Sequence, residues 1–190
     1  MHDIEPFHKW EKYYVANEDE RSPFYQREYN FQLYTQEIYG YFIDPYWDYI
    51  GSETLYIKVL FVDYTEQIAI IEFIGEWNDA LHNDIMYFKR NIIESLIGTG
   101  ITKFILLGEN IMNFHYSDDS YYEEWFEEVE DGWIAIVNFR DHVILEMQQI
   151  GLDHYFLSGG EIEKIEWRTH SPVHFYEKIS GIIKKRLNLI

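Results

Sequence analysis

The chain contains no cysteine and no long apolar run, and both shortages exclude classes of protein. Without Cys among its 190 residues, it has no disulfide, thiolate metal site or cysteine nucleophile. No apolar run approaches the roughly 20 residues that a membrane-spanning helix needs. The sequence starts with MHDIEPFHKWEKYY, which has no basic region followed by an apolar stretch, so we expect no secretory signal. These features together predict a cytoplasmic protein with no membrane partner.

Basic residues are also scarce, because 15 Lys and Arg stand against 34 Asp and Glu. The formal net charge of -19 repels phosphate backbones and anionic lipids, so we expect no nucleic-acid partner. Most of the acidic excess falls within residues 111–170. A protein partner of such a surface is expected to be basic.

Aromatic residues are abundant, at 19% of the chain, and they give residues 1–52 a different texture from residues 53–190. Residues 5–15 predict a short helix, and the alternation over residues 29–34 predicts a half-buried strand. The segment YGYFIDPYW at residues 39–47 is too aromatic for a solvated linker. We interpret residues 1–52 as an extension that packs on the α/β domain of residues 53–190 or on a second subunit, which allows a homodimer.

From residue 53 onwards, apolar patterns of strand and helix alternate. Residues 55–62 and 68–74 predict an antiparallel hairpin. The elements expected after it are a helix with the apolar stripe Leu81, Ile85, Phe88, Ile92 and Leu96, a strand at 103–107, a helix capped by Ser117, a strand at 133–139, a helix at 141–150, a short strand at 154–157 and a helix opened by Ser171 and Pro172. This order predicts an α/β fold with a mixed, mostly parallel sheet and helices packed on it.

The order of elements over roughly residues 53–158 resembles that of STAS-type domains, the fold of anti-sigma-factor antagonists, and flavodoxin-like domains are equally compatible with it. The resemblance implies a regulatory module with a phosphorylatable Ser or Thr at the start of the helix after the third strand. Ser117 and Ser120 occupy a similar place, which makes them candidate phosphosites. The family's compact Asp-Ser-Ser/Thr-Gly type of motif is absent, and the connection from Gly108 to Ser117 is longer.

Polar residues follow three of the predicted strands. The carboxyl ends of parallel strands share one edge of a sheet, where open α/β sheets usually place ligands. The candidate ligand-site residues at this edge are Glu76, Glu109, Asn110, His115 and Arg140. Glu76 and Glu109 could act as paired carboxylates in acid–base chemistry, and Arg140 could hold an anionic group. The alternative is structural, because turn formers and helix caps are also expected at these positions.

We predict no cofactor and no specific metal site. Glu109, His115, Asp118 and Asp119 offer oxygen and nitrogen ligands, but their spacing matches neither an EF-hand loop nor an HExxH helix. The P-loop, Gly-x-Gly-x-x-Gly and Gly-x-Ser-x-Gly motifs are absent from the sequence. The common signatures of nucleotide binding and of serine hydrolases are therefore missing.

Two interpretations of function follow. The leading one is a regulatory or protein-interaction module without catalytic activity. It would bind a partner through an acidic surface of carboxylates that carry no compensating base, namely Glu123, Glu124, Glu127 and Glu128. The alternative is a small-molecule or metal-dependent enzyme with its site at the carboxyl ends of the strands. That alternative requires the candidate ligand-site residues to converge in a concave pocket.

Overall fold

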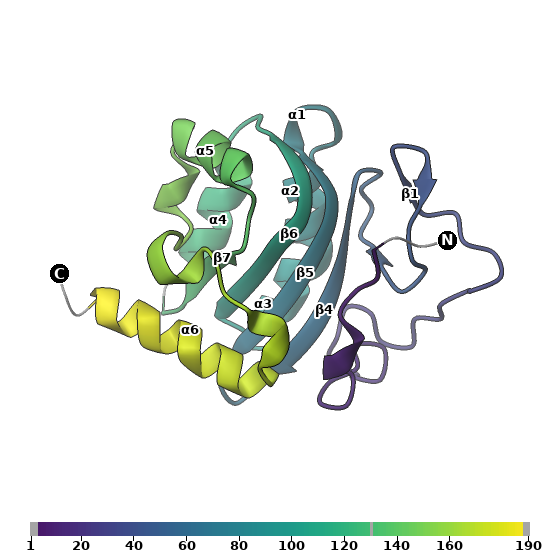
Figure 1. The fold of residues 1–190 in the computed structure, drawn as a ribbon, viewed down its shortest axis with the longest axis horizontal. Helices are drawn as coiled ribbons and strands as arrows, with labels where there is room; N and C mark the ends of the chain where they lie inside the picture. Colours follow the sequence, from purple (N-terminus) through teal and green to yellow (C-terminus); the bar gives the residue numbers. More distant parts are fainter. Residues whose placement is uncertain (1–3, 130, 188–190) are drawn as a thin grey trace.

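The computed structural model describes residues 4–129 and 131–187, which form a mixed sheet covered by helices (Figure 1). The five strands lie in the order β3, β4, β5, β6 and β7. Their bounds are Asp48–Tyr49, Leu55–Asp63, Ile68–Asn78, Lys103–His115 and Trp133–Val137. Neighbours among β3, β4 and β5 are antiparallel, whereas β6 is parallel to both β5 and β7. The predicted α/β fold with an antiparallel hairpin is confirmed.

Helices cover both faces of the sheet, as Figure 1 shows. One face carries α1 (Asp79–His82), α2 (Asp84–Phe88), the π-helix η2 (Lys89–Ile93), α3 (Glu94–Gly98), α4 (Ser120–Glu128) and α5 (Asp141–Gln149). The other face carries α6 (Pro172–Leu187). Short 3-10 helices lie at η1 (His8–Trp10), η3 (Leu152–His154), η4 (Gly160–Ile162) and η5 (Trp167–Thr169). Alternating strand residues supply both apolar cores, because successive side chains point to opposite faces.

The helical stripe predicted between residues 79 and 98 forms, but the helix is interrupted at Asn83. Asn78 caps its start by accepting a hydrogen bond from the backbone N–H of Leu81 at 3.0 Å. Asn83 then adopts a left-handed conformation with φ 53°, which separates α1 from α2 and leaves Leu81 81% exposed. The remaining stripe residues are buried. Gly100, with φ 94°, lies in the turn that leads into β6.

Residues 4–52, which we call the N-terminal segment, differ from the prediction in their local structure. The expected helix at residues 5–15 is only the single turn η1, and residues 29–34 form no strand. Two residues each form β1 (Glu37–Ile38) and β2 (Tyr41–Phe42), which pair as a separate hairpin. The strand prediction at residues 29–34 is wrong because the period-2 pattern is met here by aromatic packing in an irregular segment. The division of the chain at residue 52 stays a prediction.

β5 and β6 end later than the sequence predicted. β6 continues eight residues past Leu107, and β5 continues to Asn78, because the two strands stay paired as far as Asn78 and His115. Gly108 is therefore no turn residue. A Cβ at Gly108 would lie 2.2 Å from Cδ2 of Phe139, so glycine is needed for close approach.

Two smaller predictions after β6 also need correction. Ser117 does not cap α4, because the helix begins at Ser120 with Asp119 in the N-cap position. Residues 154–157 form no strand; the 3-10 helix η3 ends at His154, and Leu157 makes a single parallel bridge to Ala135. The C-terminal helix is as predicted, since Ser171 Oγ accepts a hydrogen bond from His174 N at 3.3 Å in front of Pro172.

Candidate functional site

The two carboxylates predicted to pair do not meet. Glu76 lies within β5, where it accepts hydrogen bonds from the Tyr39 hydroxyl and from Nδ2 of Asn113 at 2.9 Å. The imidazole Nε2 of His115 lies 4.0 Å from the Glu76 carboxylate. Glu109 lies within β6 and shares none of these partners. The structure thus joins Glu76 with His115 and separates both from Glu109.

The other candidate ligand-site residues do not complete a common site. Arg140 is exposed, and its Nε donates to the backbone carbonyl of Glu109 at 3.3 Å. Asn110 stands opposite Ile74 in the ladder between β5 and β6. Among the described residues, no group of three or more His, Asp or Glu is placed to hold a metal ion. The convergence that the enzyme alternative requires is not formed by these residues.

A different set of charged residues crosses the sheet, and we call Asp48, Lys58, Glu72, Glu109 and Arg168 the polar band. Lys58 of β4 stands directly opposite Glu72 of β5. The guanidinium of Arg168 binds both Glu72, with Nη2 3.0 Å from Oε1, and Glu109. On β5, Glu72 interrupts an apolar row between Ile70 and Ile74, which belong to different core clusters. The polar band therefore separates two apolar parts of the core.

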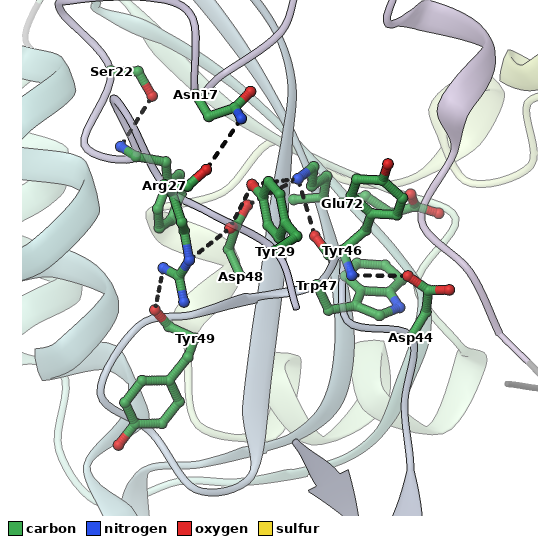
Figure 2. A network of polar contacts seen from close by, with 12 residues as sticks. Asn17, Ser22, Arg27, Tyr29, Asp44, Tyr46, Trp47, Asp48, Tyr49 and Glu72 are labelled. Carbon is green, nitrogen blue, oxygen red and sulfur yellow. Dashed lines mark hydrogen bonds and ion pairs between the residues drawn. The ribbon is translucent and has the colours of Figure 1, made fainter. Parts of the chain in front are cut away.

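One end of the polar band binds the N-terminal segment to the sheet (Figure 2). The buried Asp48 carboxylate lies 3.3 Å from Arg27 Nε and 3.3 Å from Lys58 Nζ, and it accepts a 2.9 Å hydrogen bond from the Tyr29 hydroxyl. Lys58 Nζ also donates to the Tyr29 hydroxyl at 2.7 Å and to the carbonyl of Tyr46 at 2.9 Å. Burial raises the pKa of Asp48 and lowers the pKa of Lys58. These contacts act as a structural anchor.

The other end of the polar band holds two carboxylates in different electrostatic states. Glu72 is 2% exposed and accepts a hydrogen bond from the backbone N–H of Phe7 at 2.9 Å. Burial raises the pKa of Glu72 to about 7, against the lowering effects of Phe7 and Arg168. For Glu109 burial also raises the pKa, but hydrogen bonds from Asn138, Arg168 and Trp167 outweigh burial, so its pKa is lowered. Arg168 therefore contacts two carboxylates of different character, Glu72 with a pKa of about 7 and Glu109 with a lowered pKa.

A second buried pair of carboxylates lies at the junction of α1 and α2. Asp79 accepts hydrogen bonds from the backbone N–H of Ile85 at 2.8 Å and from the buried Tyr122 hydroxyl. Burial raises the pKa of Asp79 to about 7. Asp84 accepts hydrogen bonds from Asn78 N at 2.7 Å and from Thr54 Oγ1 at 2.8 Å. Since these bonds satisfy backbone groups at the helix break, their role is structural.

The acidic surface of α4 is narrower than the sequence predicted. Lys89 of η2 places its buried Nζ 2.8 Å from Glu128 and 3.5 Å from Glu124. Arg90 binds Glu124 through two nitrogens, at 2.7 and 2.9 Å. The prediction that these carboxylates lack a compensating base is therefore wrong for Glu124 and Glu128. The bases come from η2, which packs beside α4 although it is distant in sequence.

The candidate phosphosites are both exposed; Ser120 is the first residue of α4, and Ser117 precedes it by three residues. The Ser120 hydroxyl donates to the Asp118 carboxylate, and Ser117 Oγ lies 3.5 Å from the other oxygen of Asp118. Both hydroxyls therefore contact the same carboxylate, that of Asp118. Phosphorylation at either residue stays a prediction.

The polar band as a set was not predicted from the sequence, although the sequence contains a signal for it. Lys58 and Glu72 are single charges inside the apolar runs LYIKVLFV and IAIIEFI, and such charges are rarely buried without a partner. A charge within a strand that is apolar on both sides indicates a buried ion pair or hydrogen bond. Arg168, the partner of Glu72, is 96 residues away in sequence, so the pairing itself could not be read.

No protein-family model matches the chain, and no curated protein matches it either. Among solved structures, the anti-sigma factor antagonist SpoIIAA in its unphosphorylated form is similar, with 16% identity and a TM-score of 0.42 over 55% of this chain and 89% of that one. The Bacillus cell fate determinant SpoIIAA in its phosphorylated form gives 15% identity and a TM-score of 0.38 over 55% and 92%. The structures found are thus of the anti-sigma-factor antagonist type that the order of elements resembles, at identities below 25% and TM-scores below 0.5.

Proposed function

We propose that the protein is a protein-interaction module without enzymatic activity, which associates with a second copy through its N-terminal segment and binds a basic protein partner. The observation that carries this proposal is a gathering of exposed apolar side chains on the N-terminal segment. Leu33 is 78% exposed, Tyr41 76%, Tyr39 57%, Phe42 54% and Phe31 53%. Monomeric soluble proteins rarely expose many large apolar side chains together, and such surfaces usually mark interaction sites.

The charge of the exposed apolar surface favours a second copy as its partner. Residues 30–43 contain a single charged residue, Glu37, in a chain with a formal net charge of -19. Two such molecules repel one another over most of their surfaces. A neutral, aromatic surface is where the approach of two copies costs least and buries the most apolar area.

The basic partner is assigned to the exposed carboxylates that have no base beside them. Glu123 and Glu127 project from α4 and form no ion pair within the described chain. The wider charge imbalance attracts cationic surfaces and speeds their association. Within the described residues no helix is long and apolar enough to cross a membrane. A cytoplasmic location is part of the same proposal.

Sedimentation equilibrium over roughly a hundredfold range of protein concentration tests the self-association. The native chain is expected to shift from monomer to dimer as its concentration rises. The double variant Tyr41→Ser, Phe42→Ser, altered in β2, is expected to stay monomeric. Leu145→Ser is the matched control, because Leu145 is equally exposed on α5 and lies outside the N-terminal segment. A native chain that stays monomeric throughout, or a control that dissociates equally, contradicts the proposal.

A further inference from the structure

The hairpin of β1 and β2 carries part of the exposed apolar surface of the N-terminal segment, and its backbone has a defined geometry. Tyr39 and Gly40 connect the two strands, and both have positive φ, at 53° and 77°. Two central residues with positive φ are typical of the type I′ turn, whose twist matches that of the flanking strands. In the resulting register Glu37 stands opposite Phe42.

The hydrogen bonds of the hairpin leave the backbone groups of Phe42 pointing outwards. Ile43 N donates to the carbonyl of Gln36 at 3.0 Å, so these two residues form a hydrogen-bonded pair across the hairpin. In an antiparallel ladder such pairs alternate with pairs that share no hydrogen bond. Glu37 and Phe42, the next pair, therefore direct their N–H and C=O groups away from each other. Among the described residues, no hydrogen bond joins the backbone of Phe42 to a group outside the hairpin.

The two outer edges of the hairpin have different surroundings. The edge of β1 is covered, because the backbone of Glu37 contacts the hydroxyl of Tyr56 on β4 and the buried Ile38 packs in the same cluster as Tyr56. On β2, Tyr41 is 76% exposed and Phe42 is 54% exposed. Figure 1 shows β1 on the side of β4 that is remote from α4, α5 and α6. The edge of β2 is therefore the open one.

The hairpin is held firmly against the rest of the molecule. The Tyr39 hydroxyl at its tip donates to the Glu76 carboxylate, and Nδ2 of Asn113 donates to the Tyr39 hydroxyl at 3.1 Å. Ile38 and Ile43, one on each side of the turn, are buried in one apolar cluster. The edge of β2 is thus presented in a fixed orientation, which lowers the entropic cost of binding a partner.

We propose that two copies of the chain pair through their β2 edges, antiparallel about a two-fold axis at Phe42, so that the two hairpins form one four-stranded sheet. This proposal rests on the proposed function, and it names how the second copy binds. The N–H of each Phe42 donates to the carbonyl of the other. Because β2 has only two residues, these two hydrogen bonds set the register, and the surrounding apolar side chains supply most of the affinity. Since β1 offers no free edge, the contact is isologous and stops at two copies.

The charges of the hairpin allow this pairing in an acidic protein. Glu37 is the single charged residue within residues 30–43. In the four-stranded sheet the two Glu37 residues lie three strand spacings apart, roughly 14 Å, which exceeds the Debye length of about 8 Å at physiological ionic strength. The two Phe42 rings, by contrast, are direct cross-strand neighbours, and aromatic pairs in this position are stabilising.

Single cysteines test the register, because the native chain has no cysteine. In the proposed pairing the two Phe42 Cα atoms lie about 5.5 Å apart, within the range that a disulfide can bridge. Tyr41 is more exposed, but it stands opposite Ile43 of the second copy. Its own counterpart lies about 8 Å away, beyond that range. On oxidation with diamide, Phe42→Cys is expected to form a cross-linked dimer, whereas the matched variant Tyr41→Cys is expected to stay without a cross-link.

Hydrogen exchange of the native chain gives a second readout that needs no substitution. Protection of the Phe42 amide is expected to rise with protein concentration over the range in which the chain dimerises, because the N–H gains an acceptor only in the dimer. A proline variant removes the same N–H, and an edge strand tolerates proline at such a position. Phe42→Pro is expected to dimerise roughly 25-fold more weakly than Phe42→Ala, since two net hydrogen bonds are lost at about a factor of five each.

The outcomes separate this pairing from self-association in general. Equal cross-linking of Phe42→Cys and Tyr41→Cys overturns the pairing through β2, even where the native chain dimerises. A Phe42 amide whose exchange is independent of concentration in a dimerising chain does the same, as does equal dimerisation of Phe42→Pro and Phe42→Ala. A native chain that stays monomeric throughout overturns the proposed self-association as well.

Discussion

Replacing Glu72 by glutamine should stabilise the protein, although it removes one partner of an ion pair. Glu72 is 2% exposed, and burial raises its pKa from 4.5 to about 7. The ionised form is therefore disfavoured by the fold in spite of Arg168, whose Nη2 lies 3.0 Å away. Glutamine keeps an acceptor for the N–H of Phe7 and never ionises. Arg168 keeps Glu109 as its partner.

The magnitude follows from the shift in pKa. A rise of roughly 2.5 pKa units at about 1.36 kcal/mol per unit gives ~3 kcal/mol. This is the upper bound on the stability that the protonated Glu72 contributes relative to the ionised one. Because the pKa in the folded chain is the higher one, this stability is fully present below the unfolded pKa of 4.5 and is lost as the pH rises through about 7. The native chain should therefore lose ~2 kcal/mol relative to the variant between about pH 5.5 and about pH 8.5.

Urea unfolding followed by tryptophan fluorescence, at several pH values in that interval, measures the free energies of unfolding. The difference between Glu72→Gln and the native chain is the quantity to follow, because contributions from other groups cancel in it. Glu146→Gln, exposed on α5, is the control and should show no trend with pH. If Glu72→Gln is the less stable chain at about pH 8.5, the Arg168 ion pair outweighs the desolvation of Glu72 and our account of the polar band is refuted.

Three further substitutions test other parts of the structure by the same unfolding assay. Glu109→Gln should behave in the opposite sense to Glu72→Gln. The lowered pKa of Glu109 stabilises the native chain above the unfolded pKa, and this stability is lost as the pH falls. The difference in free energy of unfolding between the native chain and the less stable variant should therefore shrink on acidification. Tyr122→Phe should cost about 1–3 kcal/mol, because Asp79 loses a buried donor; no loss would contradict that bond. Gly75→Ala should cost about 2 kcal/mol or more, since its φ is 120° and a Cβ would lie 2.0 Å from Thr54 O. The control Gly98→Ala has open space around it and should change little.

The fold class could be predicted from the sequence because it depends on local patterns. The apolar stripe from Ile85 to Leu96, the cap at Asn78 and the pair Ser171–Pro172 are each contained within a few residues of chain. The extent of β6 could not be predicted in the same way. Gly108 reads as a turn former, but its lack of a side chain admits the ring of Phe139, a contact that exists only after folding.

The candidate site was harder to predict because its partners are far apart in sequence. Glu109 was singled out as a polar group that no turn requires, and its role in a ligand site stays a prediction. Its partners Trp167 and Arg168 lie 58 and 59 residues away. The bases that neutralise Glu124 and Glu128 are also remote, because they belong to η2. Charge patterns along a sequence show which side chains need a partner, whereas the topology of the chain decides which partner they obtain.

The N-terminal segment packs against both sides of the sheet, and this has a consequence for how the molecule unfolds. Trp10 belongs to the core beneath α6, Phe24 to the core beneath α2 and α4, and Trp47 to a third cluster with Tyr56. The segment and the sheet should therefore melt in one cooperative transition. A chain shortened by its first 52 residues would expose three apolar surfaces at once, and its behaviour would report a collapsed core instead of a missing binding surface.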